Sequence, residues 1–338
     1  STFPVCKVNN ALGKENVPMI MMRDDRYAVA LADGFSRVTA GAQIGVCTVQ
    51  GGVNAAGLQV AYAGLAQAYE DGSPVLCITD GVSIGNSENS YFDVTSSLKS
   101  VSKWYGYIDS PERTHEFMRR AFTMLRNGSP GPVVIAVPDA MGQYDETKDP
   151  YHPVESWKYG PINQDISRAI DLLSEASRPI LYVGEGAVYS GASQELLKFA
   201  ELSNTPVVTT LKAKGIFPEN HTLSAGVRGL HTAHFLHTSD LIISIGSSLS
   251  PGRFSHAIPN AAEKKIIVCD INEDNVNKIY HTDHALIGDA KITLQALIEE
   301  LTKRTSGSGI ERDNIVDEIL RERQKDEAKY HDALNSSE

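Results

Sequence analysis

The sequence has little cysteine and no hydrophobic run long enough to span a membrane. Its four cysteines in 338 residues are far apart and lie mostly inside apolar runs, which favours buried free thiols over a disulfide or zinc framework. The N-terminal residues lack the basic and apolar regions of a signal peptide, so the sequence predicts a cytoplasmic protein without a membrane partner. A net charge of -11 without a basic stripe argues against nucleic acid as a partner.

The composition is that of a folded protein of more than one domain. Apolar residues make up 41% and charged residues 22% of a chain that is longer than one hydrophobic core usually supports. Short β-branched runs alternate with longer helical patterns, which is typical of a parallel sheet covered on both faces. We therefore predict an α/β fold with two doubly wound parallel-sheet domains.

The first half contains the first α/β series. We expect strands at 19–22, 44–49, 75–79 and 133–137, and helices at 26–39, 55–69 and 111–125. A stretch rich in proline and glycine then follows Pro138, and neither a helix nor the interior of a sheet tolerates it. This pattern predicts a first domain at 1–150 and a linker at 151–162.

A second α/β series predicts a domain at 163–302. We expect strands at 180–183, 207–210, 241–245 and 266–270, and helices at 166–176, 193–202, 232–238 and 292–301. Several of these strands run directly into turns with Gly or Asp, and such turns at the carboxyl ends of parallel strands are where open sheets bind ligands.

The tail at 303–338 has a different character. Residues 305–309, TSGSG, are expected to be a flexible spacer, and a highly charged helix is expected at 310–334. Its thin apolar stripe at Ile315, Ile319 and Leu320 requires a partner surface, from another domain or from another subunit.

Two adjacent carboxylates, Asp24 and Asp25, precede the helix expected at 26–39. Either could simply cap that helix, because a carboxylate there accepts free backbone N–H groups and suits the positive end of the helix dipole. The helix, however, carries small residues along one side, which indicates that something approaches its backbone closely.

The segment RDDRYAVALADGFSRVTAG at 23–41 resembles the pyrimidine-binding domain of thiamine-diphosphate-dependent enzymes of the acetolactate synthase and 2-oxo-acid decarboxylase family. Independently, SDLIISIGSS at 239–248 and KKIIVCDINEDNVNK at 264–278 are similar to the Rossmann-like central domain of the same enzymes. The resemblance covers almost everything from residue 3 to residue 301 in the family's order. It implies carbon–carbon bond cleavage or formation on a small-molecule 2-oxo acid, with thiamine diphosphate as cofactor.

In this family a carboxylate just before the small-residue helix hydrogen-bonds the pyrimidine ring and thereby activates the cofactor. Ungapped alignment on ALADGFSR places Asp25 where the family usually has glutamate, with Asp24 as the alternative. Aspartate is shorter by one methylene, and a displacement of about 1 Å in such a contact can cost about a hundredfold in rate. The site is therefore expected either to be impaired or to be tuned to different chemistry.

The glycine-rich loop QGGVNAAG at 50–57 follows a strand and opens a helix, so its N–H groups could meet polar ligand atoms. Alignment from one side makes Gly57 and Gln59 the cofactor-binding residues, and alignment from the other makes them Gly51, Gly52 and Asn54. A plain strand-to-helix turn is the structural alternative. The polar segment at 86–93 lies where the family closes its substrate channel, and a surface turn explains it equally well.

In the family, a third domain marked by Gly-Asp-Gly holds the diphosphate through Mg²⁺, and no such motif occurs in this sequence. The first domain also starts late relative to the family, as if N-terminally incomplete. The resemblance therefore implies that the diphosphate-binding domain comes from elsewhere, either from the rest of a longer chain or from a separate subunit. Because the family builds its site between two chains, a homo-oligomer or a hetero-complex is expected.

Some relatives bind FAD or ADP in the central domain. The resemblance assigns this second site to ten positions: Gly226, Arg228, Gly229, Gly246, Ser247, Ser248, Arg253, Asp270, Asn272 and Asp289. The two arginines could bind a pyrophosphate. Glycines that only make tight turns, and arginines that pair with surface carboxylates, explain the pattern equally well.

Three histidines, His231, His234 and His237, lie on roughly one side of the helix expected at 232–238. A solvated or lightly buried helix face is favoured over a metal site, because no carboxylate or cysteine completes one nearby in the sequence. The alternative to an enzyme is a non-catalytic or degenerate subunit that binds a nucleotide or a partner through the central domain and the charged tail.

Overall fold

The computed structural model describes residues 6–51, 56–81, 94–138, 142–252 and 255–336. The chain divides into two compact units, Ser1–Trp157 and Lys158–Glu338, and each is considered by itself. None of the helices in these described ranges is both long enough and apolar enough to cross a membrane.

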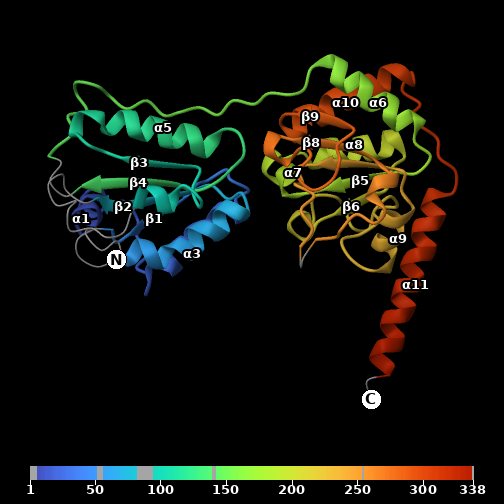
Figure 1. The fold of residues 1–338 in the computed structure, drawn as a ribbon, viewed down its shortest axis with the longest axis horizontal. Helices are drawn as coiled ribbons and strands as arrows, with labels where there is room; N and C mark the ends of the chain where they lie inside the picture. Colours follow the sequence, from blue (N-terminus) through green and yellow to red (C-terminus); the bar gives the residue numbers. More distant parts are fainter. Residues whose placement is uncertain (1–5, 52–55, 82–93, 139–141, 253–254, 337–338) are drawn as a thin grey trace. The chain divides into compact units, whose positions relative to one another are not determined.

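The first unit is a four-stranded parallel sheet with helices on both faces (Figure 1). The strand order is β1-β2-β4-β3, and every described pair of neighbouring strands is parallel. Its elements are α1 (Cys6–Lys14), α2 (Asp25–Val38), β1 (Gly45–Val49), α3 (Ala56–Glu70), β2 (Val75–Gly81), α4 (Val94–Leu98), β3 (Trp104–Tyr107), α5 (Thr114–Arg126) and β4 (Val133–Pro138).

Alternation along the strands produces the two cores of this unit. Cys77 on β2 faces a cluster with α2 and α3, whereas its neighbour Leu76 faces a cluster with α5. Successive side chains of a strand point to opposite faces, so the apolar runs are buried on both sides, as expected for a parallel sheet.

The second unit is a five-stranded parallel sheet of order β6-β5-β7-β8-β9. Its elements are α6 (Asn163–Glu175), β5 (Pro179–Val183), α7 (Glu185–Ser190), α8 (Ser193–Ser203), β6 (Val207–Thr209), α9 (Leu230–Thr238), β7 (Leu241–Ile245), β8 (Lys265–Asp270), β9 (His284–Ile287), α10 (Ala290–Arg304) and α11 (Ile315–Asn335). One face of the sheet packs on α6, α8 and α10, and the other packs on α9 and α11. The prediction of two doubly wound parallel-sheet domains is confirmed.

The tail helix α11 packs on its own domain, and its partner surface is α9 (Figure 1). Ile319 is fully buried in the cluster that α9 forms with the sheet, and Ile315 packs against the same cluster. Leu320, the third residue of the predicted stripe, is 46% exposed. Residues 305–309, expected to be a flexible spacer, form a turn, after which the N–H of Ile310 donates to the carbonyl of Leu202 at 2.9 Å.

The prediction of a strand at 19–22 is wrong. Residues 17–22 form neither helix nor strand, and Ile20 and Met21 are 76% and 78% exposed. An apolar run forms a strand only where a neighbouring strand accepts its backbone hydrogen bonds, and no described strand pairs with this segment.

Candidate functional site

The two adjacent carboxylates have different roles in the structure. Asp24 is the N-cap of α2, and its Oδ1 accepts a hydrogen bond from the backbone N–H of Arg26 at 2.8 Å. Asp25 is the first residue of the helix, and its Oδ1 accepts from the backbone N–H of Gln50, just after β1, at 3.1 Å. Asp24 therefore satisfies the helix end. Asp25, half-buried, is turned toward the loop that follows β1.

Close approach of the backbone around Asp25 depends on Gly57, at the start of α3. A Cβ atom added to Gly57 would lie 2.7 Å from Cβ of Gln50 and 2.8 Å from Oδ2 of Asp25. Such distances are sterically forbidden, so only glycine fits here without displacing the carboxylate. The small residue lets α3 begin directly against Asp25.

Of the two alternative glycine-loop assignments, one contributes a residue that lies against Asp25, and the other contributes the neighbour of the residue that bonds to it. Gly57 comes from one alignment, and Gly51, which directly follows Gln50, comes from the other. Gln59 is exposed on α3. Gly52 and Asn54 lie outside the described residues, as does the segment at 86–93.

A buried carboxylate that the sequence analysis did not single out lies at the end of β2. Asp80 is 5% exposed, and its Oδ1 accepts from the backbone N–H of Gly51 at 2.5 Å. The available signal was the position of an aspartate at the carboxyl end of a parallel strand, where open sheets place functional groups. The strand's apolar residues alone did not show that this side chain turns toward the loop after β1.

Two buried thiols, Cys47 and Cys77, lie near Asp25. Cys47 and Cys77 are register partners on β1 and β2, and neither is in a disulfide. A hydrogen bond with Cys47, burial and the negative charge of Asp25 together raise the pKa of the Cys77 thiol. The Cys77 side chain therefore packs as a neutral thiol at neutral pH, and the prediction of buried free thiols is confirmed for Cys47, Cys77 and Cys269.

In the central domain, the residues expected at a nucleotide site are used within the chain. Gly246 has φ of +61°, and its carbonyl accepts from the N–H of Gly186 at 2.9 Å, which joins the residue after β7 to the start of α7. Asp270 accepts from the backbone N–H of Asn272 at 2.8 Å and from the side chain of Asn275 at 3.1 Å. Burial raises the pKa of Asp270.

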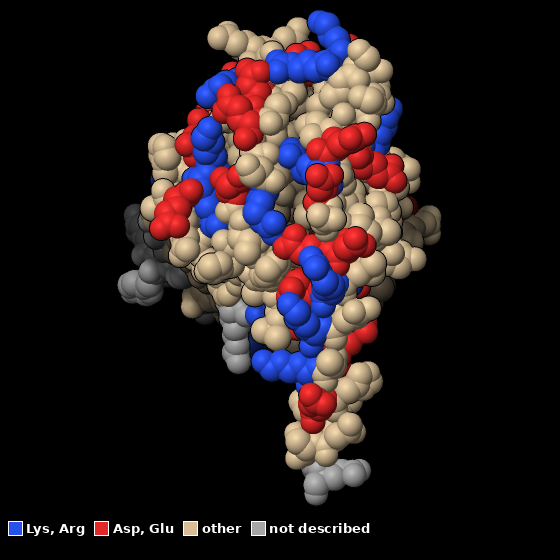
Figure 2. Space-filling view, turned by 90° about the vertical axis from the view of Figure 1, so that its right-hand side faces the viewer, with Lys and Arg blue, Asp and Glu red and all other residues tan. Residues whose placement is uncertain are grey.

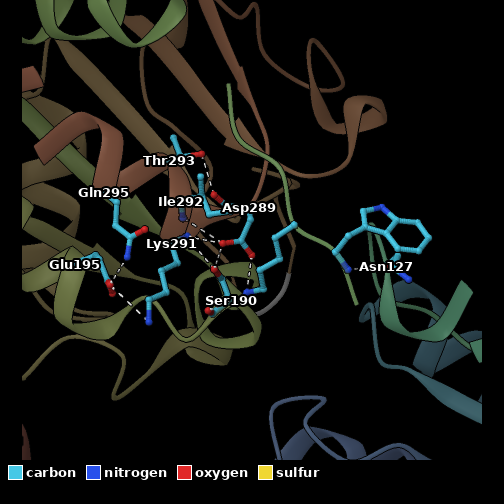
Figure 3. Close-up of polar contacts among 10 residues, drawn as sticks. Asn127, Ser190, Glu195, Asp289, Lys291, Ile292, Thr293 and Gln295 are labelled. Carbon is cyan, nitrogen blue, oxygen red and sulfur yellow. Dashed lines mark hydrogen bonds and ion pairs between the residues drawn. The ribbon is translucent and has the colours of Figure 1, made fainter. Parts of the chain in front are cut away.

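Asp289 is the N-cap of α10 and the centre of a polar cluster (Figure 3). Its Oδ1 accepts from the hydroxyl of Ser190 at 2.8 Å and from the N–H groups of Lys291 and Ile292 at 3.1 and 3.2 Å. Its Oδ2 pairs with Lys158 at 2.9 Å. Both oxygens of this buried carboxylate are thus occupied, so its geometry fits a structural role and does not show a nucleotide site.

Two other residues expected at that site, Ser247 and Arg228, are not fully buried. Ser247 bonds locally, since its Oγ accepts from the N–H of Leu249 at 3.3 Å, and Arg228 is exposed. Arg253 lies outside the described residues.

The helix α9 carries His231, His234 and His237, and the first two pair with the tail helix. His231 Nδ1 contacts Asp326, and His234 Nε2 lies 2.7 Å from Oε1 of Glu318. Glu318 also pairs with Arg178 at 2.6 Å. Across the described parts of the chain, no group of three or more His, Cys, Asp or Glu side chains could hold a metal ion. The carboxylates that partner these histidines are more than 80 residues away in sequence, so the sequence did not show them.

Two segments match known families. Residues 3–100 match the thiamine pyrophosphate enzyme N-terminal TPP binding domain, and residues 166–297 match the thiamine pyrophosphate enzyme central domain. A solved structure, described as a putative thiamin diphosphate-dependent enzyme from Mycobacterium smegmatis, has a TM-score of 0.69 at 21% identity. The similarity covers 82% of this chain and 54% of that one, and it supports the fold.

Curated relatives agree with the family match. The chain is 35% identical over 306 residues to a probable acetolactate synthase large subunit of Methanocaldococcus jannaschii, which covers 86% of this chain and 51% of that protein. It is 32% identical over 295 residues to glyoxylate carboligase of Escherichia coli O157:H7, covering 83% and 48%. The chain thus spans about half the length of the curated relatives it matches. It belongs to the thiamine-diphosphate-dependent enzymes, of which it carries the N-terminal and central domains.

Proposed function

We propose that this chain takes part in thiamine-diphosphate-dependent cleavage or formation of a carbon–carbon bond on a 2-oxo acid, with Asp25 as the group that binds the pyrimidine ring. The observation that carries the proposal is the placement of Asp25. Asp24 caps α2, so the Asp25 carboxylate is not needed for that role. Asp25 instead accepts a hydrogen bond from the turn after β1, and Gly57 allows the start of α3 to lie close to it.

The residues of this site fit an aminopyrimidine. An ionised carboxylate offers about four acceptor positions, and the N–H of Gln50 uses one of those on Asp25. A further acceptor position on the Asp25 carboxylate can accept a hydrogen bond from a protonated ring nitrogen of the bound pyrimidine. A carboxylate stabilises the protonated form of a nearby base in this way. Buried thiols at Cys47 and Cys77 keep water from the base of the site.

Thiamine diphosphate, when bound, supplies the electron sink that carbon–carbon bond cleavage requires. The proposal places Mg²⁺ and the diphosphate on a further domain or on a partner chain, as the resemblance implies. Within the described ranges no carboxylate or histidine cluster could take that ion. FAD or ADP in the central domain has no support from the geometry of Asp270 and Asp289, and no step is assigned to either.

A second copy of the chain is proposed to cover the exposed face of α2. Tyr27, Leu31 and Phe35 follow one another at helical spacing and are 54%, 44% and 44% exposed. Among the described residues, no atom lies within 4 Å of the position that a Cβ on Gly34 would occupy, so this face leaves room for a closely approaching partner. The expected result of Leu31→Glu is a shift toward monomer in analytical ultracentrifugation, whereas an unchanged sedimentation coefficient would remove this part of the proposal.

The proposed function is tested by mixing the purified chain with Mg²⁺ and thiamine diphosphate, with and without any polypeptide encoded beside it. We expect protection from thermal unfolding and, when the assembly is complete, consumption of pyruvate or another small 2-oxo acid. Binding without turnover in both mixtures would favour the alternative of a non-catalytic subunit. Absence of both binding and turnover would contradict the proposal.

A further inference from the structure

The turn after β1 is held by carboxylates from two different elements. Gln50 donates its backbone N–H to Asp25 on α2, and the next residue, Gly51, donates its N–H to Asp80 on β2. The N–H groups of two consecutive residues are therefore bound by two acidic side chains that are 55 positions apart in the sequence.

The contact with Asp80 is buried and short. Asp80 is 5% exposed, and the distance from the nitrogen of Gly51 to its Oδ1 is 2.5 Å. An N–H group that is left without its buried acceptor is costly. This bond therefore fixes the distance between the backbone of Gly51 and the end of β2.

Close packing of Gly51 against Asp80 and Thr79 also holds the turn at the end of β2. A Cβ atom on Gly51 would lie 2.1 Å from the carbonyl oxygen of Asp80 and 2.5 Å from Oγ1 of Thr79. The absence of a side chain thus lets the turn lie directly on the end of β2. Because Gln50 precedes Gly51, any movement of Gly51 away from Asp80 also moves the N–H group that binds Asp25.

We propose that Asp80 is a positioning residue for Asp25, acting through the backbone of Gln50 and Gly51. The proposal rests on the proposed function for the role of Asp25, whereas the mechanical link between the two carboxylates can be measured without it. Asp80 contacts the turn and is not assigned a contact with substrate or cofactor.

The test compares three variants of the whole chain by amide hydrogen exchange at Gln50 and Gly51. Asp80→Ala removes the acceptor, and we expect exchange at least tenfold faster at both amides, which corresponds to about 1.4 kcal/mol or more. Asp80→Asn keeps a side-chain oxygen in place, so exchange is expected to stay within about threefold of the wild type.

Ser36→Ala is the matched control, because Ser36 links α2 to the opposite end of β1. Its hydroxyl donates to the carbonyl of Pro74 at 2.5 Å and accepts from the N–H of Gly45 at 2.8 Å. This variant is expected to lower stability in general while leaving the ratio of exchange rates between Gly51 and the rest of β1 unchanged.

Affinity for thiamine diphosphate with Mg²⁺ in the assembled complex is the second readout. We expect Asp80→Ala to weaken it by about tenfold and Asp80→Asn to restore it. Unchanged exchange at Gln50 in Asp80→Ala would overturn the positioning role. Faster exchange there, together with Asp25→Ala leaving cofactor affinity intact, would instead overturn the proposed function and leave the link between Asp80 and the turn standing.

Discussion

The carboxylate of Asp25 accepts a hydrogen bond from the backbone N–H of Gln50 at 3.1 Å, although 25 positions separate the two residues. This contact joins the start of α2 to the loop after β1. It distinguishes Asp25 from Asp24, whose side chain bonds within its own helix end.

Gly57 is predicted to be intolerant of a side chain. In Gly57→Ala the new methyl group would lie 2.7 to 2.8 Å from Gln50 and from the Asp25 carboxylate, so we expect a loss of about 1–3 kcal/mol in the free energy of unfolding, measured by denaturant titration. Cofactor affinity should fall with it. Gly34→Ala is the control, because no atom lies near its missing Cβ and alanine favours a helix interior by up to about 1 kcal/mol. Equal stability of the two variants would contradict the prediction.

Docking of α11 on α9 is predicted to be lost in acid. For both Glu318 and Asp326, burial by itself raises the pKa. Hydrogen bonds from Arg178 and His234 to Glu318, and from His231 to Asp326, outweigh burial, so the pKa of each carboxyl is lowered. A lowered pKa in the folded state adds stability that is complete above the ordinary carboxyl pKa of about 4 and is lost as pH falls below it.

The measurement is hydrogen exchange of residues 315–335, corrected for the intrinsic pH dependence of exchange. Protection should persist through neutral and mildly acidic pH and decline below about pH 4. The double substitution Glu318→Gln with Asp326→Asn should weaken protection at neutral pH and flatten the profile, whereas the exposed Asp317→Asn should leave both as they are. Figure 2 shows acidic and basic side chains interspersed along this helix. An identical acid transition in the double variant would contradict this account.

Asp289 is predicted to be a structural residue. Asp289→Ala removes the N-cap of α10, the acceptor of the Ser190 hydroxyl and the partner of Lys158, so we expect a loss of about 2 kcal/mol or more, seen as a lower thermal midpoint. The loss should be the same with and without added FAD or ADP. A variant with the wild-type midpoint and impaired nucleotide binding would show instead that the carboxylate serves a ligand.

Most of the architecture could be predicted from the sequence because its strands are long apolar runs between clear turn signals. The strands β3, Trp104–Tyr107, and β9, His284–Ile287, were missed; each has only four residues and lies at the edge of its sheet. Residues 19–22 were wrongly predicted to form a strand, because no described strand pairs with this apolar run. Strand formation depends on neighbours that the local sequence does not reveal.

The candidate site was predictable in part. Alignment on the small-residue helix gave Asp25, with Asp24 as the alternative. The two alignments of the glycine loop gave either Gly57 and Gln59 or Gly51, Gly52 and Asn54, and the roles of these residues stay predictions. Asp80 could not be found in this way, because its role depends on how close the end of β2 comes to the turn after β1. The tail shows the same limit, since the stripe at Ile319 predicted burial but not that α9 of its own domain would supply the surface.

The central claim is tested most directly by the affinity for thiamine diphosphate with Mg²⁺, measured by calorimetry on the chain together with whichever polypeptide completes it. Asp25→Ala is compared with Asp24→Ala, which should lower helix stability by about 1 kcal/mol through loss of the cap. The account predicts a loss of affinity of tenfold or more for Asp25→Ala and near wild-type affinity for Asp24→Ala. Equal affinities for the wild type and Asp25→Ala would contradict it.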